Sequence, residues 1–135
     1  MKHTTLEELA DQFDAFFIDQ FGVLMDASGP YPFAVDTVKR LSEYGKPIVL
    51  ISNSGKRAKK NCDRLERLGF ELNLFTAVIT SGELAYWTIK NKFQDGWSRT
   101  PKIYLISRDA DTSPISDLSC KITENTDETD YLIIA

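Results

Sequence analysis

The chain has 135 residues, enough for one ordinary domain, and 42% of them are hydrophobic, so it can bury a core. Its 16 basic and 20 acidic residues give a net charge of −4, which argues against a general nucleic-acid binder. Two cysteines and one histidine, His3, exclude a disulfide framework and a histidine-based metal site. No apolar run approaches the roughly 20 residues of a membrane span, and no signal-peptide pattern is present. We therefore expect a soluble, cytoplasmic protein without nucleic-acid or membrane partners.

Hydrophobic periodicity predicts alternating helices and strands along the chain. A Thr5–Glu8 capping box predicts the start of the first helix, and Gly45 and Gly69 predict the ends of the next two. Helices are predicted at residues 5–13, 33–44, 56–68 and 80–88. Short apolar strands are predicted at residues 15–18, 47–51, 77–79, 102–106 and 131–134. Residues 95–101 are predicted as a loop, and residues 107–129 are polar without clear periodicity.

This order of elements predicts an α/β fold with a parallel sheet, in which the first strand is buried on both faces. In such sheets, functional groups collect at the carboxyl ends of the strands. Asp19 and Gly22 follow the first predicted strand, and Ser52 and Asn53 follow the second. A carboxylate at the first position offers a nucleophile. A hydroxyl and backbone N–H groups at the second offer a phosphate cradle, so the pair indicates phosphoryl transfer.

Each of these residues also has a purely structural interpretation. An aspartate after a strand is often a turn former, and Ser52 or Asn53 suits the N-cap of the 56–68 helix. Neither dinucleotide-binding nor P-loop glycine patterns occur. Three aromatic residues of the second half are either a stacking platform for a substrate or core residues: Trp87, Trp97 and Tyr104.

Two segments resemble motifs of a known family. Residues 17–24 (FIDQFGVL) resemble the first motif of the haloacid dehalogenase (HAD) superfamily of phosphohydrolases, and residues 48–54 (IVLISNS) resemble the second. The 79–83 segment (ITSGE) and Pro30 to Pro32 are similar to subclass IIA, the NagD-like phosphatases. The resemblance implies a Rossmann-like HAD core begun by residues 1–80. Residues 81–135 would then be a linker helix and the start of an inserted α/β cap.

The resemblance also implies a role for each site residue. Asp19 would be the nucleophile and, with the backbone carbonyl of Phe21, a Mg²⁺ ligand. Ser52 would bind the transferring phosphoryl group, helped by Asn53 and by loop amides that include Gly22. The implied activity is phosphomonoester hydrolysis (EC 3.1.3) of small phosphorylated metabolites.

The sequence departs from the family pattern in two ways. Phe21 stands where the family usually has a second aspartate that protonates the leaving group, and phenylalanine cannot transfer protons. The third and fourth family motifs are not found, so we expect a portion of a longer protein with little activity of its own. The alternative is a non-catalytic phosphate-binding or oligomerising remnant that self-associates through an exposed sheet edge.

Overall fold

A computed structural model describes residues 4–94 and 99–135, and these form two compact units. The first unit contains the described residues up to Ser52 together with Lys59–Ile79. The second contains Asn53–Ala58 and the described part of Thr80–Ala135. Three sequence-based predictions fall outside the described residues, those on His3, on Trp97 and on most of the 95–101 loop.

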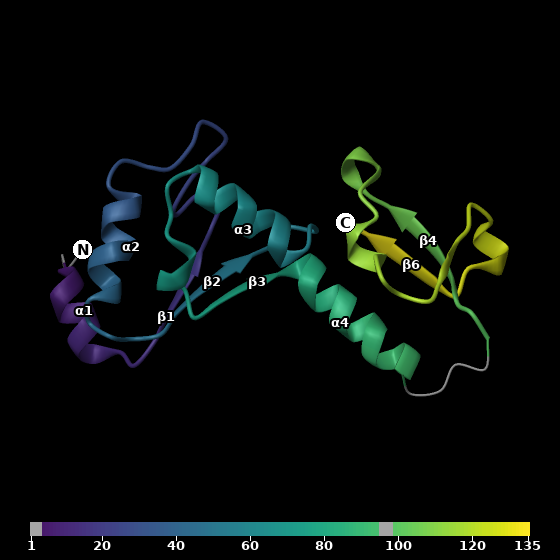
Figure 1. Cartoon of the computed structure of the whole chain (residues 1–135), viewed down its shortest axis with the longest axis horizontal. Helices are drawn as coiled ribbons and strands as arrows, with labels where there is room; N and C mark the ends of the chain where they lie inside the picture. The colour runs from purple at the N-terminus through teal and green to yellow at the C-terminus, as the bar shows by residue number, and fades with distance from the viewer. Residues whose placement is uncertain (1–3, 95–98) are drawn as a thin grey trace. The chain divides into compact units, whose positions relative to one another are not determined.

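The first unit is built on a three-stranded sheet (Figure 1). Its strands are β1 (Phe16–Asp19), β2 (Ile48–Ser52) and β3 (Ala77–Thr80), in the order β1-β2-β3. The first two strands run parallel and pair from Phe16 with Ile48 to Asp19 with Ile51. The predicted parallel neighbours are therefore confirmed, and the carboxyl ends of β1 and β2 lie side by side.

Local signals in the sequence explain where the helices begin and end. Helix α1 (Leu6–Gln12) starts at the predicted capping box, in which Thr5 and Glu8 each accept the other's backbone N–H. Helix α2 (Ala34–Ser42) is followed by Gly45, and α3 (Ala58–Arg67) by Gly69. Both glycines have positive φ, 67° and 90°, which a glycine adopts without strain. A short 3₁₀ turn (Leu72–Leu74) precedes β3.

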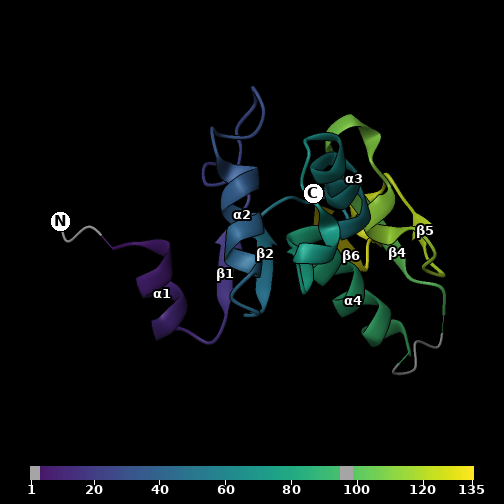
Figure 2. The same ribbon diagram turned by 60° about the vertical axis from the view of Figure 1, so that its left-hand side comes forward.

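One face of the first sheet carries the core of the first unit. Ile48 and Leu50 of β2 are buried there against Val38 and Leu41 of α2, which lies along β1 and β2 in Figure 2. The other face is open among the described residues, because Phe17 is 68% exposed. The prediction that the first strand is buried on both faces is therefore wrong. The helices that connect these strands cover only one side of the sheet.

The second unit combines α4 (Ser81–Gln94) with a second three-stranded sheet. The strands β4 (Lys102–Ile106), β5 (Lys121–Ile122) and β6 (Tyr131–Ile134) are parallel, in the order β5-β4-β6. The core consists of four isoleucines, contributed by α4, β4, a 3₁₀ turn and β6: Ile89, Ile103, Ile115 and Ile133. The region without clear periodicity contains β5 and three 3₁₀ turns, at Arg108–Ala110, Ser113–Ile115 and Thr126–Glu128.

Candidate functional site

Asp19 is the last residue of β1, and its side chain is exposed at the end of the strand. One carboxylate oxygen, Oδ1, accepts the backbone N–H of Gln20 at 2.8 Å. The Gln20 N–H also lies 3.1 Å from the carbonyl of Ile51 in β2, which fixes the start of the following loop to the sheet. The carboxylate is therefore held on a rigid strand end, as a nucleophile or a metal ligand requires.

The loop after Asp19 is a tight turn closed by its own backbone. The Gln20 carbonyl accepts the N–H groups of Leu24 and Met25, and the Gly22 N–H donates to the Met25 carbonyl at 2.8 Å. Gly22 has φ of 88°, as the turn requires. Its N–H was predicted to be part of the phosphate cradle. In this structure that N–H already has an acceptor within the loop, so Gly22 contributes the shape of the turn.

Ser52 ends β2 at the same edge of the sheet, yet its surroundings differ from those of Asp19. Asp19 is paired with Ile51, so the two share a face, and the strand pleat turns Ser52 to the opposite, buried face. Ser52 is 6% exposed, whereas the next residue, Asn53, is exposed. The strand ends are brought together as the sequence predicts, but the pleat directs the two side chains to different faces.

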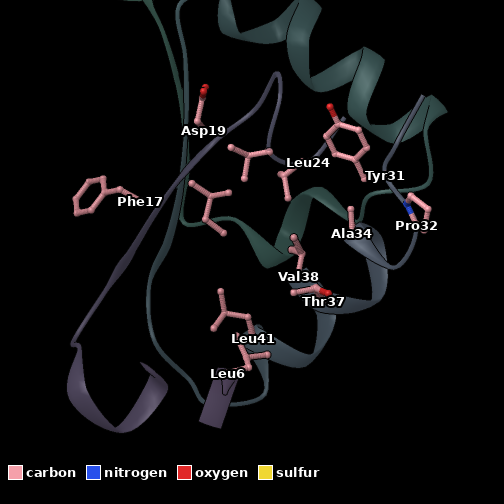
Figure 3. A pocket seen from close by; sticks show the side chains of 12 residues that line it. Leu6, Phe17, Asp19, Leu24, Tyr31, Pro32, Ala34, Thr37, Val38 and Leu41 are labelled. Carbon is pink, nitrogen blue, oxygen red and sulfur yellow. The ribbon is translucent and has the colours of Figure 1, made fainter. Parts of the chain in front are cut away.

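A cavity of about 630 Å³ borders Asp19 (Figure 3). Asp19 is the single charged residue in its lining, and the hydroxyl-bearing Tyr31 and Thr37 are the other polar side chains. In Figure 3 Asp19 lies at one end of the cavity and Leu6 and Leu41 at the other. Ser52 does not line this cavity, so it is not a hollow shared by Asp19 and Ser52. Its volume is typical of a small-molecule site.

Because residue 21 is a phenylalanine, it offers a metal ion only its backbone carbonyl and no side-chain carboxylate. The hydrogen bonds of the loop use the Gln20 carbonyl and the Gly22 N–H, and none of them uses the Phe21 carbonyl. The Asp19 carboxylate and this carbonyl are hard oxygen donors of the kind that Mg²⁺ takes, alongside water and phosphate oxygens. Among the described residues, no three His, Cys, Asp or Glu side chains cluster into a metal site. The donors fit Mg²⁺ chemically, with one protein carboxylate among them.

Sequence reasoning missed one buried polar residue at the site and one ion pair in the second unit. Gln20 is only 3% exposed, and its Nε2 has no hydrogen-bond partner in the part of the chain that the structure describes. In the second unit, Arg57 forms a two-bond ion pair with Glu83. Glu83 lies inside the family-like segment 79–83, but its pairing with Arg57 across 26 positions leaves no periodic signal in the sequence.

Comparison with known proteins relates the chain to haloacid dehalogenase-like hydrolases. A family model described as haloacid dehalogenase-like hydrolase matches residues 16–119. A curated protein named 4-nitrophenylphosphatase, from Schizosaccharomyces pombe, is 39% identical over 54 residues. That match covers 40% of this chain and 18% of the relative, so the chain spans only a fraction of that relative's length.

Solved structures resemble the whole described fold. A haloacid dehalogenase-like hydrolase from Brucella suis 1330 has a TM-score of 0.80 at 21% identity, over 99% of this chain and 48% of that one. A glycerol phosphate phosphatase from Mycobacterium tuberculosis, solved in complex with magnesium, has a TM-score of 0.65 at 17% identity. This likeness covers 94% of this chain and 37% of that one. The family resemblance predicted from the sequence is confirmed.

The described residues contain no helix that is both long and apolar enough to cross a membrane.

Proposed function

The chain belongs to the haloacid dehalogenase-like hydrolase family, and on that premise we propose that it hydrolyses phosphate monoesters through Asp19. The observation that carries this proposal is the position of Asp19, a rigidly held carboxylate at the carboxyl end of β1 beside a cavity of small-molecule size. The name of the 39% identical relative, 4-nitrophenylphosphatase, supports the same reaction class.

In the proposed reaction, an Asp19 carboxylate oxygen forms a bond to phosphorus as the bond from phosphorus to the alcohol oxygen breaks. The alcohol leaves with a proton, and water then cleaves the acyl phosphate to release inorganic phosphate and restore the carboxylate. Asn53, which is exposed directly after β2, and Ser52, the last residue of β2, are proposed to hydrogen-bond the transferring group, Ser52 once its side chain turns from the buried face. The apolar cavity next to Asp19 suits the organic part of a small phosphorylated metabolite.

Mg²⁺ is proposed as the cofactor, with Asp19 and the Phe21 carbonyl as its protein donors. When bound, it supplies positive charge that reduces repulsion between the carboxylate and the phosphate. The magnesium-bound glycerol phosphate phosphatase with the same fold supports this choice. Phe21 has no proton to give, so the alcohol takes its proton from solvent. General acid–base help contributes roughly 10²–10⁴ in rate, and we therefore expect slow turnover.

The test is hydrolysis of 4-nitrophenyl phosphate with Mg²⁺ by the wild type and by Asp19→Asn. We expect the variant to fall to the buffer rate, because an amide is not a nucleophile at phosphorus. Asp11→Asn, a change at an exposed position of α1, is the matched control and should retain the wild-type rate. Equal rates for the wild type and Asp19→Asn would exclude Asp19 as the nucleophile.

A second candidate is a phosphate-binding or self-associating protein without turnover. Phe21 favours it, as does the open sheet face on which Phe17 and Ile51 are 68% and 41% exposed. Such a protein binds inorganic phosphate but does not hydrolyse the aryl phosphate, and sedimentation at increasing concentration reveals any self-association. Hydrolysis that depends on Asp19 would contradict this candidate.

A further inference from the structure

The segment Asn53–Ala58, directly after Ser52, is hydrogen-bonded to Thr80 and to the first turn of α4. The Gly82 N–H donates to the Ser54 carbonyl at 3.0 Å, and the Thr80 hydroxyl donates to the Lys56 carbonyl at 2.8 Å. The Thr80 oxygen also accepts the Glu83 N–H at 3.0 Å, so one hydroxyl connects the segment to the helix. These contacts explain why the segment belongs to the second unit although it follows β2 in the chain.

Charged side chains strengthen this attachment. Arg57 donates to Glu83 through Nε at 2.7 Å and Nη2 at 2.9 Å, and the same carboxylate accepts the Ala58 N–H at 3.0 Å. The guanidinium lies 3.4 Å from the ring centre of Tyr86, which is 5% exposed. Both charged side chains are only about one-fifth exposed, so water screens the pair weakly. We call Arg57, Glu83 and Tyr86 the clamp.

Two glycines make the close approach possible. A Cβ added at Gly82 would lie 2.0 Å from the Gly55 carbonyl oxygen, and one added at Gly55 would lie 2.6 Å from a backbone atom of Ala135. Both distances are too short for real atoms, so any larger residue at Gly82 must displace the 53–58 segment. The path of this segment therefore depends on the clamp and on the absence of a side chain at position 82.

We propose that the clamp is a positioning device for phosphate binding. It holds Asn53 and its neighbours in the conformation that receives the phosphoryl group, and Gly82 permits that conformation. This inference rests on the proposed function, because Asn53 and Ser52 are the groups proposed to bind the transferring phosphoryl. Arg57 has the charge to bind phosphate directly, but its Nε and Nη2 already donate to Glu83, which assigns it the positioning role.

The two roles of Arg57 predict opposite effects of removing Glu83. If Arg57 bound phosphate itself, Glu83→Gln would release the guanidinium and strengthen binding. If the clamp positions the segment, both Glu83→Gln and Arg57→Gln weaken binding. Gly82→Ala must then weaken it as well, although alanine favours helix over glycine. Gly82→Ala displaces the 53–58 segment without weakening helix α4, so weaker phosphate binding in this variant cannot come from loss of helix.

The experiment measures the dissociation constant of inorganic phosphate with Mg²⁺ by NMR, and KM and kcat for 4-nitrophenyl phosphate, in the full chain. Losing hydrogen bonds to a charged partner is expected to raise the dissociation constant and KM about tenfold in Glu83→Gln and Arg57→Gln, with a smaller change in kcat. Arg57→Lys should recover part of the loss. The matched control is Glu66→Gln, at an exposed glutamate of α3, and it should bind phosphate as the wild type does.

Amide hydrogen exchange reports on the clamp independently of activity. Exchange at Ala58 should accelerate in Glu83→Gln, while amides of the first unit such as Gln20 keep their rates. Unchanged phosphate binding in folded Glu83→Gln and Arg57→Gln, or tighter binding in Glu83→Gln, would overturn the positioning role and leave the function of Asp19 intact. If the wild type neither binds phosphate nor shows Asp19-dependent hydrolysis, the proposed function fails and the positioning role fails with it.

Discussion

Asp19 ends β1 and Phe21 follows it by two positions, and the two residues differ in what they can contribute to the proposed reaction. Asp19 brings a carboxylate that can attack phosphorus, whereas Phe21 is 54% exposed and brings only a backbone carbonyl to the site. An exposed phenylalanine contributes little to the core, so its side chain can be changed at small cost to folding. The position is therefore suited to a direct test of what a proton donor adds.

We predict that Phe21→Asp raises the rate of alkyl phosphate hydrolysis, in which the leaving alcohol needs a proton, about 10²-fold, the lower end of what general acid–base groups contribute. Phe33→Asp is the matched control, because Phe33 is also an exposed phenylalanine, at 78%, and lies outside the proposed machinery. The measurement is kcat at saturating substrate with Mg²⁺ for both variants. No gain in Phe21→Asp would show that this position does not supply the proton.

The sequence located the strand ends of the site but not the orientation of its side chains. Asp19 and Ser52 were found because each follows an apolar run, and parallel pairing brings the two runs together. Which face of the sheet each side chain occupies depends on the register of strand pairing, and a shift of one residue reverses it. A single sequence therefore cannot specify these orientations. The burial of Gln20 depends on the turn that follows it, which is a tertiary feature.

At the scale of elements, strong local signals gave accurate predictions. The capping box at Thr5 and the apolar runs of β4 and β6 were placed to within a residue of the observed bounds. Helix α4 runs to Gln94, further than predicted, because its later turns pack Ile89 into the core of the second unit. Strand β5 was missed because two residues are too short to show a period of two.

Ion pairs between elements predict how stability depends on pH. The Arg57 guanidinium lowers the pKa of Glu83. Asp130 precedes β6 and accepts a hydrogen bond from the backbone N–H of Lys102 in β4, which is the main cause of its lowered pKa. A hydrogen bond from the Arg99 side chain lowers this pKa further. A carboxyl group with a lowered pKa in the folded state stabilises the protein above its unfolded-state pKa, and this contribution is lost as pH falls through the folded-state value. We expect the free energy of unfolding to be level near neutrality and to fall below about pH 4.5.

Urea unfolding between pH 7 and pH 3 checks this dependence. Glu83→Gln should lose less stability on acidification than the wild type, because it has no carboxyl group to protonate at that position. Stability that stays constant or increases down to pH 3 would contradict the proposed contribution of these pairs.

At the scale of the whole chain, the two units share one unusual feature, an open apolar sheet face. Phe17 and Ile51 are exposed in the first sheet, and Leu132 and Ile134 are 59% and 74% exposed in the second. Parallel sheets are usually covered on both faces. The Brucella structure with a similar fold, of which this chain covers 48%, is about twice as long. The division into a 1–80 core and an 81–135 cap portion remains a prediction.

The central claim is that the Asp19 carboxylate accepts a phosphoryl group, and a trapped analogue tests it without requiring turnover. Beryllium fluoride binds phosphate-accepting aspartates as a stable analogue of the acyl phosphate, and ¹⁹F NMR detects bound fluoride. With Mg²⁺ present, we predict bound resonances for the wild type and for Asp11→Asn, and none for Asp19→Asn. Bound resonances that persist in Asp19→Asn, or their absence from the wild type, would contradict the account.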